Sequence, residues 1–324
     1  MLFIYRITLL TLLFFAINLC ANPLPNPSSL PHPSSKPLKI ILDWYINPDH
    51  APLFVAEQQG FFKEAGVSVE LIQPADTADG PKLVAAGQAD LALTYQPAFM
   101  HQVDMGLPLV RVGSLINQPL ASLIVLKSSP IHTIRDLKGL TIGYSNPAAD
   151  EFMLEMMLRH HGLSLNDVHT INVRFSLLHA LLTNNIEAIA GGMRNVEKIL
   201  LDMNGHPARL FYPEKNGIPS YDELIFITHQ KNIHDPRLKL FLTALKKGVQ
   251  YLKKHPQSSW DQFSQKYPEK GEMSRRVWFV SLPYFSKNPA KLDKEKYQHF
   301  MLFMWENHFL NRQIPLSEYT VQIE

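Results

Sequence analysis

The chain has 324 residues, of which 46% are hydrophobic and 19% are charged, and its formal net charge is +2. This composition is typical of a globular protein, and the balanced charge without a basic block argues against nucleic acid and against a polybasic membrane surface as partners. A single hydrophobic core rarely reaches this size, so we expect two lobes.

The first predicted element is an export signal. A basic residue precedes an apolar run over residues 7–17, and Ala21 then follows as the last residue before a cleavage site. Because the run is too short to cross a bilayer, we interpret residues 1–21 as a signal peptide and expect a periplasmic protein. Lipidation of Cys20 is an alternative, although Leu19 stands where a small residue is expected. Cleavage after Ala21 would leave a mature chain without cysteine and therefore without disulfides.

A linker and two α/β lobes are predicted after the signal. Residues 22–37 are rich in proline and serine, which predicts an extended segment. From Lys39 onward short apolar strands alternate with helical patterns, which indicates mostly parallel sheets flanked by helices. The alternation restarts near Ser122, and a helix-rich tail follows Asp235. We expect lobe 1 to comprise residues 38–123 and 227–324, and lobe 2 to comprise residues 124–226.

The predicted elements follow one another in a regular order. Strands are predicted at residues 39–44, 67–73, 90–95, 110–116, 122–127, 140–144, 168–174, 187–192, 208–213 and 223–229. Helices are predicted between them at residues 52–66, 80–88, 98–106, 133–139, 151–162, 177–185 and 195–203. Residues 82–95 and 179–192 repeat one plan of helix, tight turn, acidic residue (Asp90 and Glu187) and short strand, which supports two lobes of similar architecture.

Four segments that follow predicted strands are candidates for a binding site. In open α/β sheets, ligands bind in the crevice beyond the carboxyl ends of the strands. The segments are residues 44–50, 94–96, 143–150 and 192–197, and the third also opens a helix whose free amide groups suit an anion or a polar ring edge. The candidate ligand-binding residues are Trp44, Asn47, His50, Tyr95, Gln96, Ser145, Asn146, Arg194, Asn195 and Glu197.

Three of these residues have simpler alternatives. Trp44 is either a wall on which a ring stacks or a core residue, and its place at the end of a strand favours the wall. His50 is a ligand contact, a hydrogen-bonding group at the start of a helix, or a metal ligand, and the last is disfavoured because partners at metal-binding spacing are missing. Glu197 either contacts a ligand or interacts with the dipole of the helix that it begins.

The sequence has no catalytic motif. A Gly-x-Ser-x-Gly turn, a phosphate-loop lysine motif and a helical His-Glu-x-x-His pair are all missing. We therefore expect a binding protein and not an enzyme, with no cofactor and no metal.

Long stretches of the chain carry a family resemblance. They are LDWYINPDHAPLFVAEQQGFFKEAGVSVELIQPAD, ADLALTYQP, GLPLVRVGSLINQPLASLIVLK, DLKGLTIGYS and GIPSYDELIF, and the similarity runs from about Leu38 to His229. The chain resembles the family that joins eukaryotic thiamine-pyrimidine synthases to bacterial periplasmic pyrimidine-binding proteins. The resemblance implies a two-lobed type II periplasmic binding protein, with two hinge crossings near residues 122–127 and 221–228 and ligand bound between the lobes.

The resemblance points to the binding branch of this family. Thr94 stands where the synthases' pyridoxal-phosphate lysine is expected, Ala98 stands where their substrate histidine is expected, and their cysteine-rich motif is missing. The implied role is capture of formylaminopyrimidine or hydroxymethylpyrimidine by lobe closure, for delivery to an ABC permease of the inner membrane. We expect the binding protein to be a monomer.

The resemblance also assigns roles to site residues. Trp44 matches the family's aromatic wall, and Asn195 and Glu197 match its Asn-x-Glu element. The expected mode is a ring stacked on Trp44, with Tyr95 opposite and Glu197 accepting from an exocyclic amine. Met193 and Arg194 replace the aromatic pair that precedes this element in pyrimidine binders, so a flavin, an alkylsulfonate or nitrate is an alternative ligand.

Overall fold

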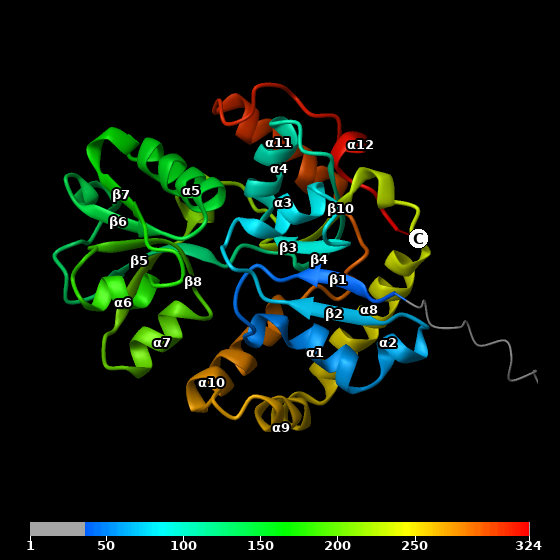
Figure 1. The fold of residues 1–324 in the computed structure, drawn as a ribbon. Coiled ribbons are helices and arrows are strands. Elements are labelled where there is room, and N and C mark those ends of the chain that lie inside the picture. The colour runs from blue at the N-terminus through cyan, green and yellow to red at the C-terminus, as the bar shows by residue number, and fades with distance from the viewer. Residues whose placement is uncertain (1–35, 324) are drawn as a thin grey trace, which may run out of the picture. The chain divides into compact units, whose positions relative to one another are not determined.

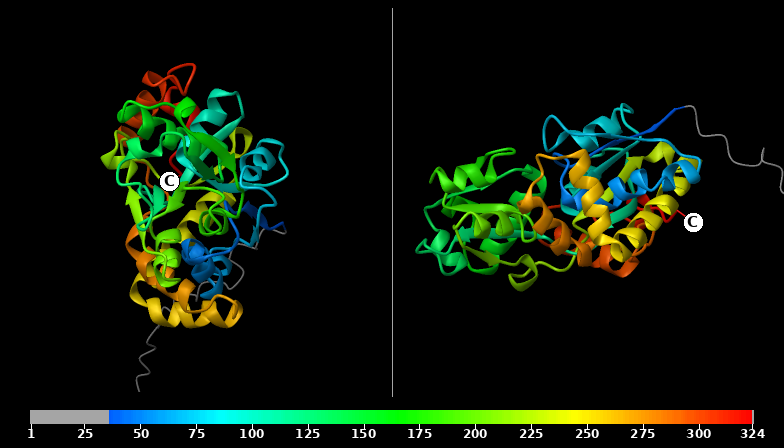
Figure 2. Two further views of the ribbon diagram at one scale, coloured as in Figure 1. Left: turned by 90° about the vertical axis from the view of Figure 1, so that its left-hand side faces the viewer. Right: turned by 90° about the horizontal axis from the view of Figure 1, so that it is seen from below.

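The computed structural model describes residues 36–323, which belong to one compact unit. The predicted signal peptide with Cys20, and the predicted linker up to residue 35, lie outside the described residues. Within this range the chain forms two five-stranded sheets with helices packed on their faces (Figures 1 and 2). The predicted α/β architecture with two lobes is therefore confirmed.

The first sheet has the strand order β2-β1-β3-β10-β4. Its strands are β1 (Leu38–Ile41), β2 (Val69–Ile72), β3 (Leu91–Thr94), β4 (Leu109–Ile116) and β10 (Leu224–His229). β1 pairs in parallel with β2 and β3, whereas β10 runs antiparallel between β3 and β4. β3 and β4 are buried along their length, as expected of strands that are covered on both faces.

The second sheet has the strand order β7-β6-β8-β5-β9 and the same plan. Its strands are β5 (Ala121–Leu126), β6 (Thr141–Tyr144), β7 (His169–Asn172), β8 (Ala188–Met193) and β9 (Ala208–Phe211). β6 pairs in parallel with β7 and β8, and β5 runs antiparallel between β8 and β9. Each sheet is thus mostly parallel with one reversed strand. The reversed strands, β10 and β5, are the strands that directly follow the two chain crossings.

The helices lie on both faces of each sheet (Figure 1). Those of the first lobe are α1 (Ala51–Gln58), α2 (Phe61–Glu64), α3 (Asp79–Ala85), α4 (Gln96–Asp104), α8 (Pro236–Lys254), α9 (Pro256–Lys266), α10 (Glu272–Ser281), α11 (Lys294–Glu306) and α12 (Leu316–Tyr319). Those of the second are α5 (Pro147–His160), α6 (Leu177–Leu182) and α7 (Glu197–Met203). No helix within residues 36–323 is both long and apolar enough to cross a membrane.

Two predicted helices differ from the structure for local reasons. The helix predicted over residues 52–66 is divided into α1 and α2, because Gly60 between them adopts φ 73° in the left-handed region. Residues 133–139 form only a short 3-10 turn, Ile134–Leu137, which a capping box of Thr133 and Asp136 closes.

The chain crosses between the sheets twice, at residues 117–120 between β4 and β5 and at residues 212–223 between β9 and β10. The predicted lobe boundaries at 123/124 and 226/227 fall inside β5 and β10, a few residues beyond these crossings. Strand pairing defines sheets and not moving bodies, so the lobe division itself stays a prediction. The Glu223 carboxylate ties the crossings together, because it accepts hydrogen bonds from the amides of Leu120 and Ala121.

The internal repeat predicted from the sequence has a structural counterpart. The carboxylate of Asp90 accepts from the amide of Lys39 in β1 (2.9 Å), and that of Glu187 accepts from the amide of Thr141 at the start of β6 (2.8 Å). The turns before these acids each contain a residue with positive φ, Gly87 at 71° and Asn184 at 56°. In each lobe, therefore, one acidic side chain fixes the start of the first parallel strand of the sheet, β1 in the first lobe and β6 in the second.

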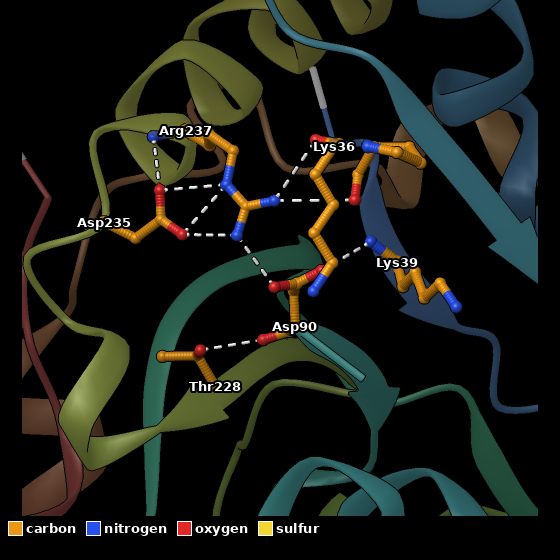
Figure 3. Close-up of polar contacts among 7 residues, drawn as sticks. Lys36, Lys39, Asp90, Thr228, Asp235 and Arg237 are labelled. Atoms are coloured by element: carbon orange, nitrogen blue, oxygen red, sulfur yellow. Dashed lines mark hydrogen bonds and ion pairs between the residues drawn. The ribbon is translucent and has the colours of Figure 1, made fainter. Parts of the chain in front are cut away.

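In the first lobe this acid belongs to a larger network, shown in Figure 3. Arg237, near the start of α8, donates to Asp90 (2.8 Å) and forms a forked pair with Asp235. Its Nη1 also donates to the carbonyl oxygens of Lys36 and Pro37, at 3.4 Å each. The tail helix α8 is thus tied to the point where the described chain enters β1.

Candidate functional site

A cavity of about 490 Å³ lies between the two sheets. Its walls include residues that follow β1, β3, β6 and β8, which is where the sequence predicts a site. Leu120 and Leu224, beside the two chain crossings, also line it. Both lobes therefore contribute to one cavity at the carboxyl ends of their parallel strands.

Three aromatic rings form one wall of the cavity. Trp44 follows β1, and its ring meets that of Phe175, which precedes α6, edge to face with centroids 4.6 Å apart. The ring of Tyr45 also packs on Phe175, with the two ring centroids 4.4 Å apart. Trp44 also packs against the apolar cluster of the second lobe around Leu177. The wall therefore joins the two lobes through ring contacts.

Asp43, directly before Trp44, holds two neighbouring side chains in place. Its Oδ1 lies 2.9 Å from His50 Nε2, and its Oδ2 accepts from the Tyr95 hydroxyl at 2.9 Å. His50 Nδ1 accepts from the amide of Asn47, so its proton lies on Nε2 and is donated to Asp43. Burial, followed by the nearby charge of Asp43, raises the pKa of Tyr95 well above its usual value, which keeps the hydroxyl protonated.

Asp49 forms a buried contact between the lobes. It lies in the 3-10 turn η2 (Pro48–His50), and its Oδ1 accepts from Asn195 Nδ2 at 2.7 Å and from Ser281 Oγ at 2.9 Å. Asn195 precedes α7 in the second lobe, whereas Ser281 ends α10 in the first. Burial raises the pKa of Asp49 to about 6, against the lowering effect of the Ser281 hydrogen bond. We call these three residues the latch.

Asp150 is fixed by the backbone at the start of α5. Its Oδ2 accepts from the amides of Ser145 (2.9 Å) and Asn146 (2.8 Å). Its carboxyl group lies directly over Gly191, where any Cβ would come within 2.1 Å of Oδ1. Gly191 is therefore needed for this close approach, and its φ of 82° also suits glycine alone. Burial raises the pKa of Asp150 to about 7.

Glu197 begins α7 and turns back toward β8. Its Oε2 accepts from the amide of Met193 at 2.7 Å. Burial raises the pKa of Glu197 to about 7, despite this hydrogen bond, and the charge of Asp49 contributes. The carboxyl of Glu223, just behind the cavity, is raised to a pKa of about 7 by burial as well.

The charged lining of the cavity is mostly acidic. Asp43, Asp49, Asp150 and Glu197 all line it, whereas among the described residues only Lys270 brings a permanent cation to its wall. Arg194, which stands shortly before Glu197 in the sequence, is instead paired with Glu214 at 2.6 Å. The cavity is therefore suited to a ligand that donates hydrogen bonds or carries positive charge.

Six of the ten predicted site residues line the cavity: Trp44, Asn47, Tyr95, Ser145, Asn146 and Glu197. The structure does not place the other four on its wall. His50 supports Asp43, and Asn195 belongs to the latch. Gln96 is fully buried and accepts from the amide of Asp222 at 2.8 Å, and Arg194 binds Glu214 and the carbonyl oxygens of Leu120 and Ala121. Each of the four is occupied by hydrogen bonds within the protein.

Other lining residues are absent from the predicted set. Asp43 and Asp150 lie within segments that the sequence analysis quotes, and both are acids next to the end of a strand, which is the signal that could have found them. Phe175 and Thr77 lie in loops whose place beside the cavity depends on how the lobes meet. The Thr77 hydroxyl donates to the carbonyl oxygen of Ser145 (2.8 Å), a second contact between the lobes.

The described residues do not bring three potential metal ligands of the His, Cys, Asp or Glu type into one metal-binding group.

The sequence matches a known family and several of its members. The model of the NMT1/THI5-like family matches residues 47–259. A Haemophilus influenzae protein that is named after thiamine biosynthesis is 41% identical over 298 residues, which are 91% of this chain and 95% of that protein. The formylaminopyrimidine-binding protein of Halalkalibacterium halodurans is 32% identical over 221 residues, which are 68% of this chain and 67% of that protein.

Synthases and solved structures are similar at lower identity. The Legionella pneumophila protein named 4-amino-5-hydroxymethyl-2-methylpyrimidine phosphate synthase is 26% identical over 264 residues, which are 79% of this chain and 82% of that protein. The alkanesulfonate-binding protein SsuA of Xanthomonas axonopodis pv. citri, solved bound to MOPS, has a TM-score of 0.72 at 15% identity, over 90% of this chain and 100% of that one. This likeness shows the fold, which is that of two-lobed periplasmic binding proteins.

The raised pKa values of the acids predict how stability depends on pH. The pKa values of Asp150, Glu197 and Glu223 are about 7 in the folded protein, above those of unfolded carboxyls, so the folded state holds more protons between pH 4 and 7. The free energy of unfolding of the ligand-free protein should therefore fall as pH rises from 5 to 8. Urea denaturation measures this, and Glu197→Gln should flatten the slope. If the unfolding free energy of Glu197→Gln depends on pH as steeply as that of the wild type, the raised pKa of Glu197 is contradicted.

The latch predicts a structural role for Asn195. In Asn195→Ala, Asp49 loses a buried donor and the lobes lose a contact, so the unfolding free energy should fall by about 1–3 kcal/mol. The average separation of the lobes should also increase in small-angle X-ray scattering. Asn185→Ala, which removes an exposed hydrogen bond to Thr183 within the second lobe, is the control. Identical scattering curves for the wild type and Asn195→Ala would rule the latch out.

Proposed function

This chain belongs to the NMT1/THI5-like family, and from that premise we propose that it is the periplasmic solute-binding component of an ABC importer for a thiamine-precursor pyrimidine. The ligand proposed is formylaminopyrimidine or hydroxymethylpyrimidine. The observation that carries the proposal is a cavity lined by the three aromatic rings and by four acidic side chains, with one lysine among its described lining residues. A flat ring with an exocyclic amine complements both.

The proposed contacts use the cavity as the residues form it. The ring stacks on Trp44, which already meets Phe175, while Tyr95 stays bound to Asp43. Glu197 accepts from the exocyclic amine, and Asn47, Ser145 and Asn146 contact the remaining ring edge. Stacking contributes about 1 kcal/mol beyond burial, and a hydrogen bond to a charged group contributes roughly 1.5–3 kcal/mol. Together with apolar burial these interactions support micromolar or tighter binding.

Capture by closure follows from where these residues come from. Trp44 and Asp49 belong to the first lobe and Phe175, Asp150 and Glu197 to the second, so a ligand that contacts both sets favours the arrangement in which the lobes meet. A permease that recognises this arrangement would receive loaded protein in preference to empty protein. The name of the Halalkalibacterium halodurans relative, a formylaminopyrimidine-binding protein, supports the same ligand class.

Anionic ligands are disfavoured by the same lining. A sulfonate or nitrate needs cations or several hydrogen-bond donors, whereas here four carboxyl groups and one lysine line the cavity. Such a ligand would have to displace or protonate the acids, which costs binding energy. A flavin, as another flat heterocycle, is the remaining small-solute alternative.

The direct test is to identify and titrate the ligand. Mass spectrometry of small molecules released on denaturation should find a pyrimidine, and calorimetry should measure its affinity. Glu197→Gln should weaken binding at least about tenfold, because a charge-assisted hydrogen bond is lost. Glu151→Gln, in which the changed acid lies in α5 but not on the cavity wall, should bind as the wild type does. Unchanged affinity in Glu197→Gln would remove Glu197 from the site.

The second candidate function is a synthase, since relatives of that name exist. Thr94 and Ala98 stand where the resemblance places the lysine and the histidine of the synthases, so the binding function is favoured. The purified protein mixed with pyridoxal phosphate should show no absorbance of a bound aldimine, and no consumption of the cofactor. A stable aldimine band on this chain would favour the synthase.

A further inference from the structure

Three carboxyl groups reach the cavity from different elements, and each has one oxygen committed to the protein. Asp49 uses Oδ1 for the latch, Asp150 uses Oδ2 for two backbone amides, and Glu197 uses Oε2 for the Met193 amide. The second oxygens are Asp49 Oδ2, Asp150 Oδ1 and Glu197 Oε1. Across residues 36–323 no side chain or amide hydrogen-bonds to Asp49 Oδ2 or Asp150 Oδ1, and the further donor to the Glu197 carboxyl is its own amide.

Two of these acids are held almost entirely away from solvent. Asp49 is 5% exposed and Asp150 is 8% exposed, yet both line the cavity. The second oxygens are not themselves fully buried, so a carboxylate that has lost most of its hydration can still accept there from a proton or from a ligand that donates. The second oxygens are therefore acceptors that await donors from the cavity side.

The groups around these acids do not supply the missing positive charge. Asp43 is bound by His50 and Tyr95, and Glu223 by two amides, while Arg194 is paired with Glu214. Lys270, before α10, and His179, in α6, line the cavity, but neither forms an ion pair with Asp49, Asp150 or Glu197 in the described part of the chain. Among the described residues that line the cavity there are thus four carboxyl groups, those of Asp43, Asp49, Asp150 and Glu197, and one permanent cation, Lys270.

We propose that the cavity selects a heteroaromatic amidine and binds it as a cation, with a protonated ring nitrogen and the adjacent amino group donating to the free carboxyl oxygens. The inference rests on the proposed function, because it specifies the charge state of the bound pyrimidine. A protonated ring nitrogen beside an amino group presents two parallel N–H bonds, as a guanidinium does to a carboxylate. A neutral ring with the same amine offers one donor fewer and leaves the negative charge of the cavity uncompensated.

Binding then takes up a proton. At pH 8 a free aminopyrimidine is neutral and the acids are ionised, so one proton passes from solvent to the ring nitrogen as the complex forms, without any other bond being made or broken. Above this pH the affinity should fall by about tenfold per pH unit, because each bound ligand requires one proton.

The experiment uses 4-amino-5-hydroxymethyl-2-methylpyrimidine and the full chain. Calorimetry at pH 8 in phosphate and in Tris, which differ in ionisation enthalpy, should give an uptake close to one proton per ligand. The ultraviolet spectrum of the bound ring should be that of its protonated form. The 4-oxo analogue, which lacks the amidine, should bind at least about a hundredfold more weakly.

Variants locate the acceptors. Asp150→Asn and Glu197→Gln should each weaken binding at least about tenfold and reduce the proton uptake, whereas Glu151→Gln should change neither. Glu197 is partly exposed, so its variant provides the test if Asp150→Asn does not fold.

The possible results separate the inference from the proposed function. Binding of the aminopyrimidine without proton uptake, or equal binding of the 4-oxo analogue, overturns the inference and leaves the proposed function standing. Proton uptake with a neutral-ring spectrum places the proton on a carboxyl group and also overturns it. If neither of these pyrimidines nor formylaminopyrimidine binds, the proposed function fails as well.

Discussion

The cavity depends on carboxyl groups that the backbone holds in place. Asp150 and Glu197 accept hydrogen bonds from amides at the ends of β6 and β8, so the carboxyl ends of these two parallel strands of the second sheet fix both side chains. Asp49 is fixed from both lobes by the latch. Because these acids are desolvated, the empty cavity carries an electrostatic cost that a donor-rich solute removes. Binding of such a solute would thereby be linked to lobe contact through the carboxyl group of Asp49.

The two sides of the cavity join the lobes by different forces. On one side α5 packs on α4 and α11 in a continuous apolar cluster that includes Phe99, Phe152 and Phe300. Toward α10 the contacts are the polar latch and the edge of α7, and the rings of Trp44 and Phe175 add a smaller apolar contact between the lobes. Water can replace hydrogen bonds at small net cost, whereas separating apolar surfaces is costly. We therefore expect the lobes to part on the side of the latch and to pivot near the apolar cluster.

Much of this arrangement follows from the sequence, and the exceptions share one cause. Strand-helix alternation predicted all ten strands, and the position of polar residues after β1, β3, β6 and β8 located the cavity, because these features depend on local periodicity and on sheet geometry. The contact of the Phe175 ring with Trp44, and the hydrogen bond of Asn195 in the latch, depend on how the two lobes meet. Periodicity holds no information on that contact, so a polar residue at a strand end cannot be assigned to ligand or to partner lobe from the sequence.

The charge of the ligand is decided by a few side chains and not by the fold. The alkanesulfonate-binding protein that shares this fold at 15% identity was solved bound to MOPS, which is a sulfonate. In this chain the corresponding strand ends carry Asp43, Asp150 and Glu197, and the arginine in the same turn as Glu197 is turned away to Glu214. A fold that places backbone amides and short loops at strand ends can hold either charge, and the acids here make an anion the costly choice. The same acids are the reason that we propose an amine-bearing ring, and not merely a flat one, as the ligand of this cavity.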